Sequence, residues 1–244
     1  MSNPLKFYYD LMSQPARALY MFLNLNQIPY QGCKIDIAKG EHLTADYENI
    51  NPFKRIPCIV DGDFKLSESV AIYRYLAGEY KVEEHWYPTD AKKRARVDEY
   101  LEWQHMNARL AFSTYFWRTW LIPNLFGKAV SKAKIVEAKK HMETTLDLLT
   151  NVWLKDNQFV AGDEISVADL VAATEVEQLV YAPTEQAPDD VKDAFYEQLA
   201  QTLNNVKKSD MLVLLGDLNA QVGSLNVNWE NVMGTHGLGT MNDN

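Results

Sequence analysis

The sequence has 244 residues, of which 47% are hydrophobic and 23% charged, with 24 basic and 33 acidic side chains and a formal net charge of −9. This composition is typical of a soluble globular protein with one large domain or two small ones. The sequence has no run of 18 apolar residues and no secretory signal, so we expect no membrane partner. The acidic balance argues against a nucleic-acid partner held by charge. Two cysteines cannot form a disulfide framework, which favours a reducing, cytoplasmic location.

The first 80 residues alternate between predicted strands and helices. Strand-type patterns occur at residues 5–9 and 30–37, and as a hairpin over 57–66. Helical spacing of apolar residues occurs at 16–24, more weakly at 41–48, and again at 69–79. Ser13 is a good N-cap for the first helix, and Pro15 is tolerated in its first turn. The order β-α-β-α-β-β-α predicts a small α/β domain over residues 1–80.

The second block, residues 90–180, is predicted to be all-α. Two long helices are expected at 91–112 and 129–154. Ser166 and Asp169 match a capping box that opens a third helix, which runs to about Gln178. The fold class is therefore α/β plus all-α, a helical bundle packed on a small α/β domain.

The composition changes near residue 180. Residues 181–244 contain three basic and nine acidic side chains, and so hold most of the net negative charge. A shift of this size indicates a boundary. We therefore treat residues 181–244 as a separate, atypical tail.

Seven short motifs follow one another in register between residues 4 and 178. They are YDLMSQPARA at 9–18, KGEH at 39–42, RIP at 55–57, LSES at 66–69, HWYP at 85–88, RARV at 94–97 and FVAGD at 159–163. Together they resemble the theta-class glutathione transferases. The resemblance implies a thioredoxin-like domain and a helical domain, usually in a homodimer. It also implies an enzyme that conjugates glutathione to small hydrophobic electrophiles, with glutathione as co-substrate and no metal.

Such a reaction requires the glutathione thiol to ionise. A free thiol has a pKa near 8.5, and lowering it by about two units requires roughly 2.7 kcal/mol. One hydrogen bond to a charged acceptor supplies roughly 1.5–3 kcal/mol. Ser13 lies where a hydroxyl and a helix N-terminus act together, and the resemblance places the catalytic serine there. Two alternatives remain open: Ser13 only caps the helix, or Tyr9 supplies the hydroxyl, as a tyrosine does in related classes.

The remaining expected contacts concern the ends of glutathione. Ser69 opens a helix whose free N–H groups suit the γ-glutamyl carboxylate, and Glu68 could face the ammonium group. A plain capping pair is the alternative. The resemblance makes Pro57 a cis-proline that turns the backbone of Ile56 toward the cysteinyl part of glutathione.

Three further side chains are assigned by position. By resemblance, His42 and Arg55 approach the glycine carboxylate, although an isolated histidine of this kind is more often a surface residue. Arg109 matches a position that reaches toward glutathione or the substrate pocket, and a solvated arginine on a helix face is the alternative. No metal constellation occurs in residues 1–180, and Cys33 and Cys58 do not form a Cys-x-x-Cys pair.

The sequence leaves the aromatic residues unassigned between core and substrate site. They are Trp103, Phe112, Tyr115, Phe116, Trp117 and Trp120. Aromatics at helical spacing are core by default, but an apolar electrophile site would use the same residue types.

The tail resembles another family. The string LLGDLNA at 214–220 is similar to the endonuclease domain of retrotransposon-encoded proteins. Tyr181, Asp217 and Asn219 match residues that act beside Mg²⁺ in that family. Because the family's earlier metal-binding glutamate and late Asp-His pair have no counterpart, we expect a non-functional fragment. Since this tail stands where a transferase would continue its helical domain, we also expect that domain to be truncated.

Three functions are therefore compared. The first is a glutathione transferase, the second a non-catalytic glutathione-binding or scaffold domain, and the third, remotely, a Mg²⁺-dependent endonuclease. The first rests on the motifs of residues 4–178, the second on the shortened helical domain, and the third on the tail alone.

Overall fold

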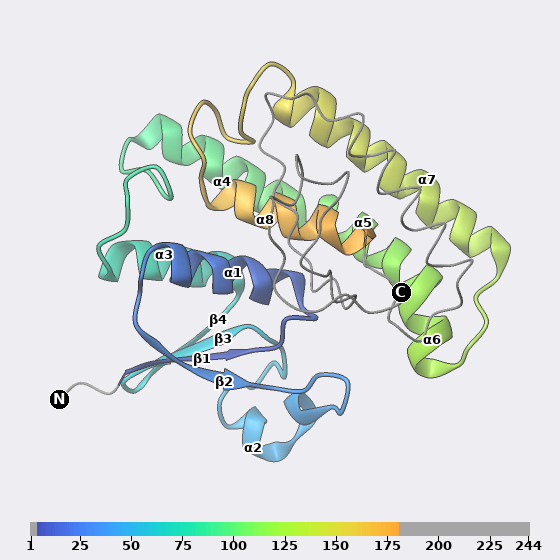
Figure 1. Cartoon of the computed structure of the whole chain (residues 1–244), viewed down its shortest axis with the longest axis horizontal. Helices are drawn as coiled ribbons and strands as arrows, with labels where there is room; N and C mark the ends of the chain where they lie inside the picture. Colours follow the sequence, from blue (N-terminus) through green and yellow to red (C-terminus); the bar gives the residue numbers. More distant parts are fainter. Residues whose placement is uncertain (1–3, 181–244) are drawn as a thin grey trace, which may run out of the picture. The chain divides into compact units, whose positions relative to one another are not determined.

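The computed structural model describes residues 4–180, and residues 4–179 of these belong to one compact unit (Figure 1). The N-terminal part has the predicted element order. Its strands are β1 (Leu5–Tyr9), β2 (Tyr30–Lys34), β3 (Cys58–Asp61) and β4 (Phe64–Ser67). Its helices are α1 (Gln14–Leu25), α2 (Ala45–Glu48) and α3 (Ser69–Glu79).

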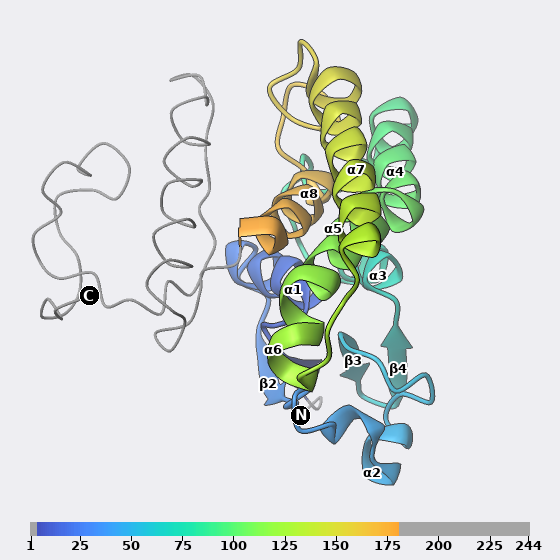
Figure 2. The ribbon, with the colours of Figure 1, turned by 90° about the vertical axis from the view of Figure 1, so that its right-hand side faces the viewer.

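The four strands form one mixed sheet in the order β2-β1-β3-β4. β1 is parallel to β2 and antiparallel to β3, and β3 and β4 form the predicted hairpin. Figures 1 and 2 show α1 and α3 on one face of the sheet and α2 on the other. The alternation in β1 buries Leu5, Phe7 and Tyr9 on the face beneath α1 and α3, as a period-two strand requires.

The helical part contains five α-helices within residues 4–180. They are α4 (Ala91–Met106), α5 (Ala108–Phe116), α6 (Ile122–Phe126), α7 (Lys132–Leu148) and α8 (Val167–Glu177). Two π-helical turns, Trp117–Leu121 and Leu149–Leu154, follow α5 and α7. A thioredoxin-like domain followed by a helical domain confirms the predicted fold class.

Some predicted boundaries were wrong. The helix expected at 91–112 is broken at Asn107, whose side-chain amide donates to the Trp103 carbonyl at 2.7 Å and whose φ and ψ are −116° and −89°. Asparagine competes for backbone groups in this way, so it weakens a helix interior. The strand expected at 30–37 ends at Lys34. The weak helix at 41–48 is a 3₁₀ turn, Glu41–Leu43, followed by α2, which Thr44 caps.

The predicted capping box is confirmed and fixes α8. The Ser166 hydroxyl accepts a hydrogen bond from a backbone N–H of the first turn of α8, and the Asp169 carboxylate accepts one from the Ser166 N–H at 2.8 Å. The other Asp169 oxygen accepts from the Val160 N–H at 2.7 Å. α8 then packs on α1, α4 and α5, so it joins the two parts of the unit through one continuous core. No helix within residues 4–180 is long and apolar enough to cross a membrane.

Candidate functional site

The sheet register brings three predicted site segments to one edge. Tyr8 of β1 pairs with Cys58 of β3, and Cys58 pairs with Ser67 of β4. The end of β1, the start of β3 and the end of β4 therefore lie side by side. The loop with Ser13 follows the first, Pro57 precedes the second, and the start of α3 follows the third.

Ser13 precedes α1 in the N-cap position, with extended backbone at φ −90° and ψ 120°. Its side chain makes no capping hydrogen bond. Within residues 4–180 its backbone is engaged: the N–H donates to the Asp10 carbonyl at 3.1 Å, and the carbonyl accepts from the Arg17 N–H at 2.9 Å. The residue is half-buried. The hydroxyl is thus available beside the positive end of the helix dipole, and the capping alternative does not describe its geometry.

Tyr9, the rival hydroxyl, is a core residue. It is 8% exposed, and its ring stacks on Phe7 with 4.7 Å between centroids and packs against Tyr20 of α1. Burial raises the pKa of Tyr9, so the hydroxyl holds its proton more firmly than a free tyrosine. Its buried position in the core does not suit the activation of a thiol.

The start of α3 has the form of an anion site. Ser69 is buried, and the first turn contains no acidic residue. The Ser69 hydroxyl has no hydrogen-bond partner within residues 4–180, and the helix N-terminus presents free N–H groups. Glu68 adopts φ +70° and ψ 106°, a sparsely populated conformation for a residue with a side chain, and it is exposed. Strain of this kind clusters at functional sites.

Hydrogen bonds from two buried side chains fix the backbone of the segment before β3. The Ile56–Pro57 peptide bond is cis, as expected. The Arg55 carbonyl accepts hydrogen bonds from the Tyr47 hydroxyl at 2.8 Å and from the Asn51 amide at 2.7 Å, and its side chain is exposed. Tyr47 and Asn51 are both buried. Sequence analysis missed these two supports, because an Asn-Pro pair after a weak helix indicates only a helix end.

His42 lies in the 3₁₀ turn before α2 and is half-buried. Its Nδ1 atom is buried and has no hydrogen-bond partner within the described part of the chain. A buried nitrogen in this state has the capacity to bind a polar ligand group. This is more than the plain surface residue that the sequence alone favours.

Arg109, in α5, is not the solvated arginine of the alternative. Its Nε donates to Oε1 of Glu175 in α8 at 2.7 Å, and its Nη1 lies 3.3 Å from Nδ1 of His105. The Glu175 side chain is fully buried and that of Arg109 is 23% exposed. The Nη2 atom of Arg109 has no hydrogen-bond partner among residues 4–180. Burial, followed by the Arg109 charge, lowers the pKa of His105, which favours the neutral ring that accepts this contact.

Glu175 is the charged residue that sequence analysis missed. It stands within the apolar run of α8, Val167–Glu177, where a carboxylate needs a cation in the core. A glutamate within an apolar helical run was therefore the sequence signal that could have predicted a buried ion pair. Burial raises the pKa of Glu175, and the charge of Arg109 opposes the rise.

The structure separates the aromatic residues that the sequence left unassigned into buried and exposed ones. Trp103 packs on Tyr100 and Trp153, and Phe112 and Phe116 are buried. Phe116 stacks on Trp120 at 5.3 Å, and Trp117 is 54% exposed. Trp103, Phe112 and Phe116 therefore belong to the core, whereas Trp117 presents apolar surface to solvent.

The two cysteines lie on either side of Tyr8 in the sheet. Cys33 and Cys58 each pair with Tyr8, so two strand spacings of about 4.8 Å separate them, too far for a disulfide. Burial raises the pKa of Cys58 to about 11. Within residues 4–180 no group of three or more His, Cys, Asp or Glu side chains is arranged to hold a metal ion.

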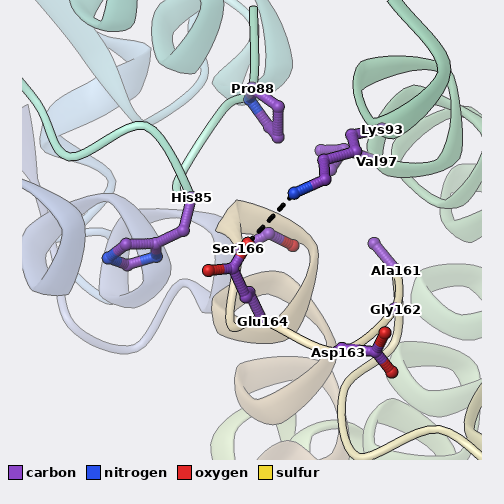
Figure 3. A pocket seen from close by; sticks show the side chains of 9 residues that line it. All are labelled: His85, Pro88, Lys93, Val97, Ala161, Gly162, Asp163, Glu164 and Ser166. Carbon is purple, nitrogen blue, oxygen red and sulfur yellow. Dashed lines mark hydrogen bonds and ion pairs between the residues drawn. The ribbon is translucent and has the colours of Figure 1, made fainter. Parts of the chain in front are cut away.

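A pocket of about 170 Å³ lies elsewhere, between the start of α4 and the loop before α8 (Figure 3). An ion pair between Lys93 and Glu164, with 3.3 Å between Nζ and Oε2, crosses it, and His85 lies at its side. None of the predicted site residues lines this pocket. The site at the sheet edge and this pocket are therefore separate features.

The groups at the sheet edge fit a peptide with a thiol and two carboxylates. At this edge Ser13 offers a hydroxyl that makes no capping bond and the α3 N-terminus offers N–H donors, while His42, in the turn before α2, offers a buried nitrogen. These are the donor types that a thiolate and carboxylates require.

Comparisons with known proteins agree with this fold and site. The glutathione S-transferase N-terminal domain family matches residues 4–78, and the glutathione S-transferase C-terminal domain family matches residues 117–212. Glutathione S-transferase theta-1 of Mus musculus is 44% identical over 172 residues, which are 70% of this chain and 72% of that protein. Theta-2 of Rattus norvegicus is 40% identical over 176 residues, 72% of each.

Solved structures give the same result. Apo human glutathione-S-transferase T1-1 has a TM-score of 0.72 and 40% identity, and the match covers 81% of this chain and 83% of that one. Human glutathione transferase theta-2, in a complex with glutathione and an unknown ligand, has a TM-score of 0.71 and 36% identity, with 81% of each chain covered. The fold and site thus define a glutathione-dependent transferase. The chain belongs to the glutathione S-transferase family, in its theta class.

The same comparisons bear on the tail. The C-terminal domain family extends past Gln178 to residue 212, and so covers part of the segment in which we expected an endonuclease-like fragment. The endonuclease resemblance receives no support from these comparisons. Its key residues, Tyr181, Asp217 and Asn219, lie outside the described residues.

Proposed function

We propose that this transferase conjugates the thiol of reduced glutathione to small hydrophobic electrophiles, and that the Ser13 hydroxyl stabilises the thiolate. The observation that carries the proposal is the uncommitted Ser13 side chain at the N-terminus of α1, on the sheet edge shared with Pro57 and Ser69. A hydroxyl that makes no capping bond can donate to sulfur without losing that bond.

The chemistry follows from that donor. The glutathione thiol gives its proton to solvent, and the hydrogen bond from Ser13 together with the α1 dipole holds the negative charge on sulfur. A sulfur lone pair then forms the bond to the electrophilic carbon. The leaving group departs with its bonding electron pair, or the electrons move into the electrophile when the reaction is an addition.

The remaining site residues bind and orient the tripeptide. Ser69 and the α3 N-terminus hold the γ-glutamyl carboxylate, and Glu68 faces its ammonium group. The Ile56 backbone, beside Pro57, pairs with the cysteinyl unit. His42 and Arg55 bind the glycine carboxylate.

The side of the site near the helical part receives the electrophile. Arg109 directs its Nη2 atom, unpaired within residues 4–180, toward glutathione or the electrophile. Trp117 supplies exposed apolar surface. The resemblance to the theta class further implies a homodimer located in the cytoplasm.

A Ser13→Ala variant tests the role of the hydroxyl, with Ser131→Ala as control. Ser131 is also a helix N-cap without a side-chain capping bond, at the start of α7, outside the sheet-edge site. We expect Ser13→Ala to raise the pKa of bound glutathione by about one to two units and to lower kcat by roughly ten- to a hundredfold near pH 6.5.

Glutathione should still bind to Ser13→Ala, because the carboxylate contacts remain. Ser131→Ala should behave as the unmodified chain. Unchanged turnover of Ser13→Ala would refute the assigned role. Retention on immobilised glutathione with no conjugation of several electrophiles by the unmodified chain would instead favour a non-catalytic binding domain.

A further inference from the structure

Arg17 links the loop that carries Ser13 to the end of α8. It lies in the first turn of α1, and its side chain is 13% exposed. Its Nε atom forms an ion pair with Oε2 of Glu177 at 2.7 Å, and its Nη2 donates to Oε1 of Gln178 at 3.0 Å. Its Nη1 donates to the Leu11 carbonyl at 2.6 Å. Nη2 also donates to the Thr174 carbonyl of α8 at 3.4 Å. One guanidinium therefore joins four groups from two parts of the unit.

Arg17 contacts the loop just before Ser13 and at Ser13 itself. The Leu11 carbonyl precedes Ser13 by two residues and accepts from the guanidinium, whereas the Ser13 carbonyl itself accepts from the Arg17 N–H at 2.9 Å. The Asp10 carboxylate holds the beginning of this loop by accepting from the Met12 and Ile37 N–H groups. The loop has no other side-chain tie to the helical part within the described residues.

The geometry requires an arginine. Three acceptors in different directions, the carbonyls of Leu11 and Thr174 and the amide oxygen of Gln178, match the planar fork of guanidinium donors, and the Glu177 carboxylate adds an ion pair. A lysine ammonium could keep the charge beside Glu177, but it could not hold the Leu11 carbonyl at the same time. The position of α8 is thus transmitted to the loop through directed hydrogen bonds rather than through charge alone.

We propose that Arg17 is a positioning residue for Ser13: it aims the hydroxyl at the glutathione sulfur by bridging the Leu11 carbonyl to Glu177 of α8. This inference rests on the proposed function of Ser13. A purely structural ion pair would change the stability of the protein and leave the ionisation of bound glutathione as it is.

The test compares Arg17→Lys with Arg118→Lys in the full chain. Arg118 is a matched control, because its Nη1 donates to the Lys134 carbonyl at 2.7 Å and pairs with Glu137 at 3.0 Å, a similar fork between two helical segments. Both changes keep the charge and remove the fork. The readouts are the pKa of bound glutathione from thiolate ultraviolet absorbance, the glutathione dissociation constant, kcat/KM against pH, and the unfolding temperature.

For Arg17→Lys we expect a thiol pKa raised by about one unit and kcat/KM at pH 6.5 lowered roughly tenfold, with glutathione binding changed less than about threefold. Arg118→Lys should alter the unfolding temperature alone. A folded Arg17→Lys protein with the thiol pKa of the unmodified chain would overturn the inference. So would an equal rise of the pKa in Arg118→Lys.

Two more variants keep the outcome decisive. If Arg17→Lys does not fold, Glu177→Leu removes both the charge and the acceptor from the α8 side of the same bridge, and an unchanged thiol pKa in that protein overturns the inference. Ser13→Ala is measured in parallel. If Ser13→Ala also leaves the thiol pKa unchanged, the proposed function fails together with this inference. A shift in Ser13→Ala without one in the Arg17 variant refutes the positioning role alone.

Discussion

Replacing Arg109 by methionine should leave the buried Glu175 carboxylate without its ion-pair partner. Methionine keeps most of the length and the apolar stem of arginine but removes the cation that pairs with Glu175. Because the Glu175 side chain is fully buried, its carboxylate then loses its ion-pair partner and has little water, and only the weaker influence of the Arg17 charge remains. Breaking a buried pair in this way typically costs about 3–5 kcal/mol.

The cost should depend on pH, since the stranded carboxyl can bind a proton instead. Protonating a glutamate of ordinary pKa costs about 5 kcal/mol at pH 8 but only about 1 kcal/mol at pH 5, which sets a ceiling on the penalty. Burial raises the pKa of Glu175 in the folded protein, so the stabilising contribution of this carboxyl is complete at low pH and is lost as the pH rises through the folded-state pKa. The Arg109→Met deficit should therefore grow from about 1 kcal/mol at pH 5 to about 3–5 kcal/mol at pH 8.

Urea denaturation at the two pH values measures this difference. Arg118→Met is the control: its partner Glu137 is 73% exposed, so we expect a loss within about 1 kcal/mol that does not change with pH. The double variant Arg109→Met with Glu175→Gln should recover part of the loss at pH 8, because no charge remains buried. A deficit for Arg109→Met that is flat with pH, or larger at pH 5, would refute the reasoning.

Three other predictions follow from the same contacts. Tyr9→Phe should leave conjugation unchanged, because Tyr9 is a core residue; a loss of turnover in a steady-state assay would restore it as a rival to the serine. Ser166→Ala should lower the free energy of unfolding by about 1 kcal/mol, since it removes the cap of α8; an unchanged denaturation midpoint would contradict this. Iodoacetamide at pH 8 should label Cys33 well before Cys58, whose pKa of about 11 leaves little thiolate, and peptide mass spectrometry would detect the opposite order.

The local sequence determined most of the elements. The alternation in β1, the hairpin β3–β4, the bounds of α3 and the capping box of α8 are set by side chains a few residues apart, and all four were predicted. The break between α4 and α5 was missed, because it depends on whether Asn107 turns its amide to the Trp103 carbonyl or to water. Spacing does not decide between the two.

The motifs also carried the family and the positions of the expected site residues, since Ser13, Pro57 and Ser69 stand at element ends that the sequence defines. Only the tertiary structure decided what surrounds them. It left the Ser13 hydroxyl without a capping hydrogen bond and stacked Tyr9 in the core. It also paired Glu175 with Arg109 across about 66 residues of chain, and Glu177 with Arg17 across about 160. Contacts over such separations depend on how α8 packs between α1 and α5, and no local pattern of apolar and polar residues encodes that packing.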